Sequence, residues 1–136
     1  MAYSETIDYA TKGEVEIIDI TQAVADVVAR SGVDAGLVTA FVVGSTAAIT
    51  TIELEPGLKM DFPDALERIA AKDGIYQHEA DGHDDNGHSH IRASLIGPCL
   101  SVPIVNGKMP LGRWQQIVLM ELDTRPRQRP VVIQVV

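Results

Sequence analysis

Histidines gather in one short polar segment of the sequence. Residues 81–94, DGHDDNGHSHIRAS, hold three of the four histidines together with three aspartates. Histidine is the commonest protein ligand of zinc and similar metals, and a catalytic zinc site takes three protein ligands and leaves one position open. His88 and His90 form an H-x-H pair, and His78 lies upstream. The predicted metal ligands are therefore His78, His88 and His90, with zinc as the expected divalent ion.

The geometry of the H-x-H pair depends on the backbone that carries it. Residues i and i+2 point to the same side of an extended segment and to different sides of a helix. His88 and His90 therefore converge on one ion only if the next helix begins at or after His90. Asp84 and Asp85 are candidate ligands, or acceptors that orient an imidazole, and His83 is a fourth candidate histidine. The alternative is a solvated polar loop, because H-x-H alone is a weak motif.

A second group of candidate residues follows an apolar strand, in GSTAAITTIELEPG. Glu53 and Glu55 share one face of an extended segment, where they could serve as an acid–base pair or as an exposed polar face. The segment Gly44-Ser45-Thr46 offers backbone N–H groups and hydroxyls for an anion. It lacks the lysine of a nucleotide-binding phosphate loop.

A third group lies in GRWQQIVLMELD and RPRQR. The single tryptophan, Trp114, is predicted to pack in the core. Gln115 and Glu121 share a strand face, and an inward polar group needs a partner because an unpaired one costs roughly 1–3 kcal/mol. Arg125 and Arg127, with Arg129, form an alternating stripe that either binds a phosphate or carboxylate or protects an edge strand.

Length, charge and cysteine content indicate the number of domains, the partners and the compartment to expect. The chain has 136 residues, a net charge of −8 and one cysteine. This length predicts one domain, residues 1–136, and the acidic charge argues against nucleic acid as a partner. The lone cysteine fits a reducing compartment, and the N-terminus does not resemble a signal peptide, so a cytoplasmic location is expected. The uncharged run 35–52 is broken at Gly44-Ser45 and rich in β-branched residues, which favours two buried strands over a membrane span.

The pattern of elements predicts an α+β fold with a largely antiparallel sheet or sandwich and two to three short helices. Consecutive strands are expected to form hairpins, with a strong turn at Asn106-Gly107. A helix capped by Thr21 ends at Gly32, and a second is capped by Asp61. A short third helix turns Ile91 and Leu95 inward. The expected strands span 4–12, 14–20, 36–43, 47–55, 100–105, 109–123 and 131–136; the expected helices span 21–32, 61–74 and 91–97.

These segments together resemble the YjbQ family of small, mostly uncharacterised proteins. FVVGSTAAITTIELEPG and NGHSHIRASLIGPCLSVPIVNGKMPLGRWQQIVLMELDTRPRQR carry the resemblance, which covers roughly residues 5–136. It implies a compact α+β fold, assembly as a homotrimer and, for some members, a secondary thiamine-phosphate synthase activity. In small trimers the site often lies between subunits, so the arginine stripe of one chain could complete the pocket of the next.

The resemblance also implies which residues belong to a site. It covers the acidic pair Glu53 and Glu55, the histidines chosen above on ligand chemistry, and the tryptophan–glutamine pair of the G-x-W-Q motif. The family has a histidine before T-A-A-I where this chain has Gly44, so no role of that histidine carries over. The matched positions are Glu53, Glu55, His78, Asp85, Asn86, His88, His90, Gly112, Trp114, Gln115 and Glu121.

Two functions are compatible with these residues. The first is a metal-dependent enzyme acting on a small phosphorylated metabolite, with Glu53 or Asp85 as general base, His90 in the catalytic set, and Thr46, Asn86 or an arginine positioning substrate. Thiamine-phosphate synthesis would need magnesium for the leaving pyrophosphate, whereas a histidine cluster suits zinc. The second is a non-catalytic trimer that binds a metal or a small phosphorylated ligand, without a membrane or nucleic-acid partner.

Overall fold

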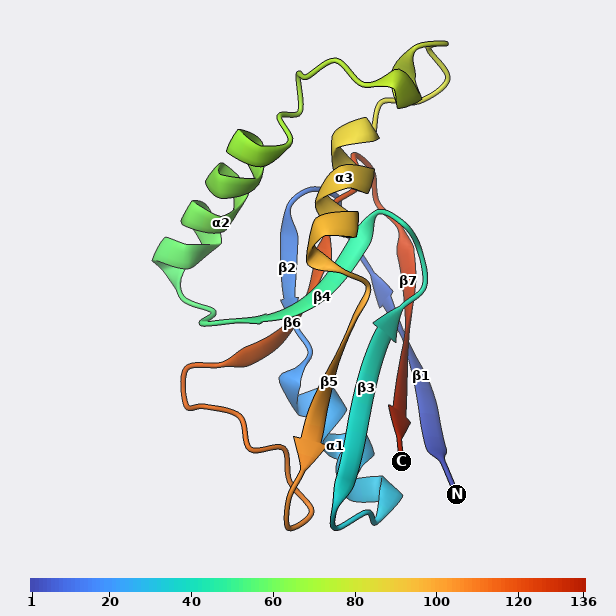
Figure 1. Ribbon diagram of the computed structural model, residues 1–136, viewed down its shortest axis with the longest axis vertical. Coiled ribbons are helices and arrows are strands. Elements are labelled where there is room, and N and C mark those ends of the chain that lie inside the picture. Colours follow the sequence, from blue (N-terminus) through green and yellow to red (C-terminus); the bar gives the residue numbers. More distant parts are fainter.

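The computed structural model describes all residues, 1–136, as an α+β protein with seven strands, three α-helices and one 3-10 helix (Figure 1). The fold class predicted from the sequence is therefore confirmed. In chain order the elements are β1 (Tyr3–Ala10), β2 (Glu16–Asp19), α1 (Thr21–Ser31), β3 (Gly36–Val42), β4 (Ala47–Ile52), α2 (Pro56–Ile69), η1 (Gln77–Glu79), α3 (Gly87–Ile96), β5 (Cys99–Ile104), β6 (Gln116–Glu121) and β7 (Gln128–Val135).

The strands form two antiparallel sheets. The larger sheet has the order β1-β7-β3-β5 and the smaller one the order β2-β6-β4. No strand pairs with the next one along the chain, so the expectation of hairpins between consecutive strands is wrong. The Asn106-Gly107 turn does form, with both residues at positive φ and a bridge between Val105 and Lys108. The strands on either side of it then separate into different sheets.

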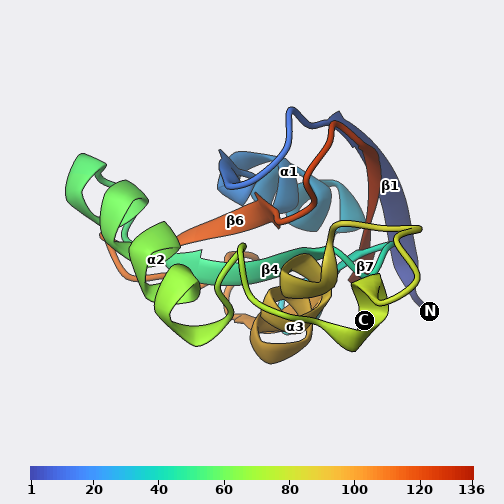
Figure 2. The same ribbon diagram turned by 90° about the horizontal axis from the view of Figure 1, so that it is seen from above.

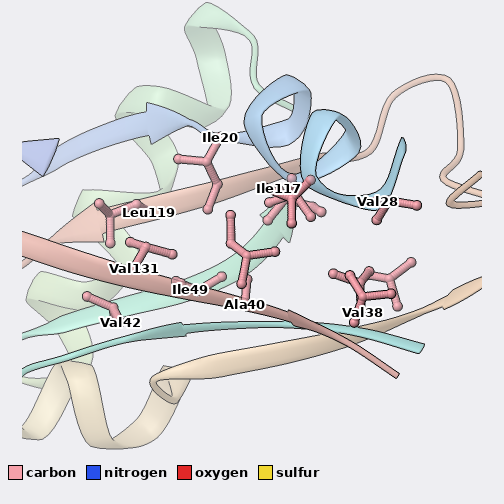
Figure 3. Close-up of a cluster of buried hydrophobic side chains, with 14 of the residues drawn as sticks. Ile20, Val28, Val38, Ala40, Val42, Ile49, Ile117, Leu119 and Val131 are labelled. Atoms are coloured by element: carbon pink, nitrogen blue, oxygen red, sulfur yellow. The ribbon is translucent and has the colours of Figure 1, made fainter. Parts of the chain in front are cut away.

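The two sheets enclose the main hydrophobic core. Alternating residues of β3 and β7 face β6 and β4, and α1 contributes Val24, Val27 and Val28 to the same cluster. Figure 3 shows Ile117 and Leu119 among these side chains, between the strands and α1. Each Å² of apolar surface removed from water stabilises the folded state by about 25 cal/mol. This layer is therefore the main contribution to the stability of the fold.

A second, smaller cluster lies on the other face of the β2-β6-β4 sheet. Val118, Met120 and Ala48 pack there against Leu66 of α2 and Ala93 of α3. Figure 2 shows α2 and α3 on one side of β4 and β6, with α1 on the other side. Helices thus cover the smaller sheet, whereas the outer face of the larger sheet has no covering element.

Two helices begin earlier than predicted. α2 starts at Pro56, and the carboxylate of its N-cap, Glu55, accepts hydrogen bonds from the N–H groups of Gly57 and Leu58. Asp61 is therefore inside the helix and does not cap it. Proline suits the first helical position because its missing N–H would have no partner there. The Pro56-Gly57 pair, expected to end a strand, opens a helix instead.

The early start of α3 changes which face it buries. The helix begins at Gly87, and its buried residues include His88, Ser89, Arg92 and Ala93. Ile91 and Leu95, expected inside, are 42% and 65% exposed. The register is shifted because the polar residues before Ile91 already form the first helical turn. The first helix, α1, ends at Gly32 as predicted, and this C-cap is in the left-handed conformation; its N-cap is Ile20, so Thr21 is the first helical residue and not the cap.

The helices are also too short or too polar to cross a bilayer: none combines sufficient length with sufficient apolar character.

Candidate functional site

A buried ion pair lies at one end of the sandwich, where β6 ends and β7 begins. Glu121 and Arg129 are 0% and 5% exposed. Arg129 donates to both carboxylate oxygens of Glu121, from Nε to Oε1 at 2.8 Å and from Nη2 to Oε2 at 2.6 Å. Thr11 Oγ1 also donates to Glu121. The partner required for an inward-facing Glu121 is therefore an arginine of the neighbouring sheet.

Asp123 extends this network toward the surface. Its carboxylate accepts hydrogen bonds from the hydroxyl of Thr46, the amide of Asn86, Nε of Arg127 and the N–H of Thr124. Burial raises the pKa of the Asp123 carboxyl, but these hydrogen bonds together outweigh it and bring the pKa to about 2. Asp123 is therefore an ionised anchor for the side chains around it.

The lowered pKa of Asp123 predicts a specific acid sensitivity. Its folded pKa is about 2 against an ordinary value of 3.8, so its contribution is present above pH 3.8 and is lost as the pH falls toward 2. We expect Asp123→Asn to lower the free energy of unfolding by about 2 kcal/mol at neutral pH and to flatten its dependence on pH in that window. Denaturant titrations across the pH range measure both effects. Asp64→Asn, at an exposed position on α2, is the control and should keep the wild-type slope.

The network fixes the tautomer of His78. The Asp123 carboxylate can only accept, so the Asn86 amide turns its nitrogen toward Asp123 and its oxygen toward His78. Asn86 Oδ1 lies 3.0 Å from His78 Nε2. Nε2 must then donate, which leaves Nδ1 of the neutral imidazole with a bare lone pair. His78 is thus prepared to accept a proton or to bind a metal through Nδ1.

His90 is the second imidazole at this position. The rings of His78 and His90 meet edge to face with centroids 4.6 Å apart. His78 is exposed and His90 is half-buried, so both can be reached from solvent. The carboxylate of Asp84 lies 3.6 Å from His78 Nε2. The histidine-rich segment is therefore a structured corner of the molecule.

His88 points away from this pair. The side chain is fully buried, and its Nε2 lies 2.6 Å from Glu14 Oε2. Glu14 Oε1 in turn makes an ionic contact of 2.5 Å with Lys72 Nζ. His88 therefore ties α3 to the β1–β2 connection and to the segment after α2. The cause is the helix start at Gly87, since neighbours two apart on a helix diverge by about 200°.

A three-imidazole zinc site consequently does not fit a single chain. No three histidine, cysteine, aspartate or glutamate side chains lie together in an arrangement that would hold a metal ion. One chain brings together His78 and His90 but not His88. Catalytic zinc takes three protein ligands, so this pair is short by one.

Asp85 is held in place by its neighbours. Thr124 Oγ1 donates to Asp85 at 2.9 Å and Arg125 Nη2 donates to the same oxygen at 3.1 Å. The hydrogen bond from Thr124, followed by that from Arg125, lowers the pKa of the Asp85 carboxyl. A carboxylate with a lowered pKa accepts a proton poorly, so the geometry favours His78 over Asp85 as a base.

The remaining predicted site residues divide between two ends of the smaller sheet. Thr46 lies beside Asp123, but its hydroxyl already donates to Asp123 and accepts from Arg129, so it supports the site without facing a ligand. Glu53 and Gln115 lie beyond the Ile52–Gln116 pair, whereas Glu121 pairs with Ala47 at the opposite end. Five residues of strand separate these pairs by about 17 Å.

Trp114 lies at that distant end and is 63% exposed, with Arg113 stacked on its ring. The prediction that it packs in the core is wrong, because the residue precedes β6 instead of belonging to it.

Two central residues were not identified from the sequence. Asp123 lies two positions after Glu121, just past the end of β6, and the alternation of the two carboxylates could have indicated a second inward one. Glu14 gives no such signal, because it lies in a connection between strands of different sheets.

Comparisons with known proteins agree with this architecture. The sequence model of the UPF0047 protein YjbQ-like family matches residues 5–136. A UPF0047 protein from Methanothermobacter thermautotrophicus is 40% identical over 133 residues, covering 98% of this chain and 91% of that protein. The UPF0047 protein YugU of Bacillus subtilis is 33% identical, covering 95% of this chain and 96% of its own length.

Solved structures with similar folds extend the comparison. A YbjQ-like protein of unknown function from Sulfolobus solfataricus superposes with a TM-score of 0.88 at 31% identity, covering 99% of this chain and 98% of that chain. An uncharacterised conserved protein of the yjbq/upf0047 family from Clostridium acetobutylicum gives 0.83 at 36% identity, covering 96% and 99%.

Proposed function

The chain belongs to the UPF0047 YjbQ-like family, and from this premise we propose that it is an enzyme whose His78–His90 corner acts on a small phosphorylated metabolite. The observation that supports the proposal best is the chain of hydrogen bonds from Asp123 through Asn86 to His78. A surface histidine would not need a buried, ionised carboxylate to fix its tautomer. Such an arrangement is typical of a group that must present one defined nitrogen to a reacting partner.

Each side chain of the corner has a role in this proposal. His78 takes a proton through its bare Nδ1, and His90, whose ring meets it edge to face, contacts the reacting group. Arg127 is 42% exposed while its Nε and Nη2 bind Asp123, so its remaining nitrogen is available to a phosphate oxygen. Arg125, half-exposed beside Asp85, is the second candidate for the phosphate.

A substrate panel tests this function. Purified protein is incubated with phosphate monoesters, phosphodiesters and the precursors of thiamine phosphate. The phosphate released from the esters and the thiamine phosphate formed from the precursors are measured. We expect turnover of at least one phosphorylated compound, and its loss in His90→Ala. Thiamine-phosphate synthesis is the most specific form of the proposal. Full turnover in His90→Ala would place the activity elsewhere, and no turnover across the panel would favour a binding function.

We further propose that the protein works as a homotrimer assembled through the uncovered face of the larger sheet. Leu37, Phe41 and Val43 are 40%, 42% and 48% exposed there. A hollow of about 390 Å³ runs between β3 and β7 on this face, lined by Thr39, Phe41, Val43, Val132, Gln134 and Val136. An apolar surface of this kind on a small protein commonly marks an interface. In a trimer, Glu53 and Gln115 of one subunit could complete the corner of another.

Assembly predicts a clear effect of charge on this face. Phe41→Asp should convert the trimer to a monomer, because three buried carboxylates would lack partners. Light scattering after size-exclusion chromatography measures the mass. Met60→Asp is the matched control: Met60 is 71% exposed on α2, in the layer farthest from that sheet, and its substitution should leave the mass unchanged. A monomeric wild-type protein, or a Phe41→Asp variant of unchanged mass, would contradict the proposed interface.

Zinc is an alternative role for the pair His78 and His90, with a third ligand from a neighbouring subunit, because an Nδ1 lone pair that binds the ion cannot also accept a proton. There it would polarise a phosphate oxygen. We expect the metal content of protein loaded with zinc and then desalted to fall at least about tenfold in His90→Ala. It should persist in His88→Gln, because His88 binds Glu14 in the interior. Equal zinc in wild type and His90→Ala would exclude the pair as ligands.

A further inference from the structure

Arg129 has one guanidinium nitrogen that the buried network does not use. Nε and Nη2 donate to Glu121 and Thr46, whereas Nη1 makes no hydrogen bond within the chain. The side chain is 6% exposed. Nη1 is not among the fully buried side-chain atoms that lack a partner, so it retains contact with solvent. An otherwise buried arginine therefore presents one donor nitrogen, Nη1, to the surface.

The turn between β3 and β4 exposes that nitrogen. Gly44 has φ +136°, and a Cβ at this position would lie 2.5 Å from Arg129 Nη1. Any other residue would force the guanidinium to move. Gly44 and Ser45 donate their own N–H groups to no other group of the chain. The turn thus combines successive free backbone donors with a guanidinium donor beneath it, which is the composition of an anion-binding concavity.

A pocket borders this turn and reaches the side of α3 that carries Ala93 and Ser94. It has a volume of about 270 Å³ and is lined by Gly44, Ser45 and Ser94 among others. Ser94 lies one helical turn after His90 on α3, and its hydroxyl donates to the His90 carbonyl oxygen. The turn and the start of α3 lie at the same end of the molecule (Figure 1).

We propose that the Gly44–Ser45 turn and Arg129 Nη1 form a phosphate-binding subsite for the substrate. The inference rests on the proposed function and places the phosphate of the metabolite at this turn and Arg129, in preference to the exposed Arg127 and Arg125. Glu121 already balances the charge of Arg129. The subsite therefore works mainly through directed N–H donors, which suit the oxygens of a small tetrahedral anion.

Phosphate titration of matched glycine variants tests the subsite. We expect inorganic phosphate to shift the backbone amide resonances of Gly44 and Ser45 and to bind Gly44→Ala at least about tenfold more weakly. Gly13→Ala is the control, since Gly13 has φ +126° and a Cβ there would meet only backbone at an ordinary 3.7 Å. It carries a similar backbone strain and should bind phosphate as the wild type does. Equal affinity in Gly44→Ala and wild type, or no shift at Gly44 and Ser45, would overturn the subsite.

His90→Ala separates this inference from the proposed function. It should abolish turnover and keep phosphate binding, because the subsite contains no part of the imidazole. If wild type binds phosphate at Gly44 and Ser45 but turns over no compound, the proposed enzyme fails and the subsite stands. If turnover is seen without those amide shifts, the enzyme stands and the subsite fails.

Discussion

Replacing Arg129 by methionine is expected to lower the free energy of unfolding by about 3–5 kcal/mol. Methionine fills much of the same space but leaves Glu121, which is 0% exposed, with a buried charge and no cationic partner. Both carboxylate oxygens lose a charge-assisted hydrogen bond from the guanidinium. Urea denaturation followed by circular dichroism measures the loss. A variant that retains wild-type stability would show that solvent reaches Glu121 in the native state.

An exposed ion pair of similar geometry provides the control. Arg30 donates to both oxygens of Glu5 at 2.7 and 2.8 Å, but the arginine side chain is 53% exposed. Arg30→Met should therefore lower the free energy of unfolding far less than Arg129→Met does, because solvent screens an exposed ion pair. The double variant Glu121→Leu/Arg129→Met should be more stable than Arg129→Met alone, because it removes the unpaired charge. This comparison separates the cost of a stranded carboxylate from a general loss of packing.

The elements themselves were largely predictable, whereas their pairing was not. Alternating apolar residues identified β1, β3 and β7, and helical spacing with a closing glycine identified α1. Each of these patterns depends on neighbours within a few residues. The pairing of β1 with β7, at opposite ends of the chain, depends on how two sheets share a core. Nothing local in either strand specifies that partner. The local hairpin signal at Asn106-Gly107 predicted a pairing of β5 with β6, and these strands lie in different sheets.

The candidate site was predicted in its composition and only partly in its geometry. Ligand chemistry selected His78 and His90, which do meet. The same reasoning selected His88, whose direction depends on a helix start that moved by only a few residues. Helix boundaries are uncertain by about that amount when read from sequence. At an i, i+2 pair, such a shift decides whether a side chain faces a ligand or the interior.

Asn86 should control catalysis through His78. His78→Ala removes the proposed base, and we expect turnover of the substrate identified in the panel to fall by about 10²–10⁴-fold. Asn86→Leu removes the acceptor that holds the Nε2 proton, so both tautomers of the neutral imidazole should become populated. Turnover should then fall by an intermediate factor of about 10–100, the range found when a group orienting a functional histidine is lost.

Nuclear magnetic resonance of the imidazole nitrogens distinguishes this positioning role from simple destabilisation. Wild type should show His78 protonated at Nε2, and Asn86→Leu should show protonation at Nδ1 as well. Ser89→Ala is the structural control, since Ser89 Oγ is buried without a partner in the same helical turn. It should alter neither the tautomer nor the turnover. If Asn86→Leu loses activity while His78 keeps its Nε2 proton, then Asn86 acts on the substrate directly, and the hydrogen-bond chain from Asp123 serves only to hold Asn86 in place.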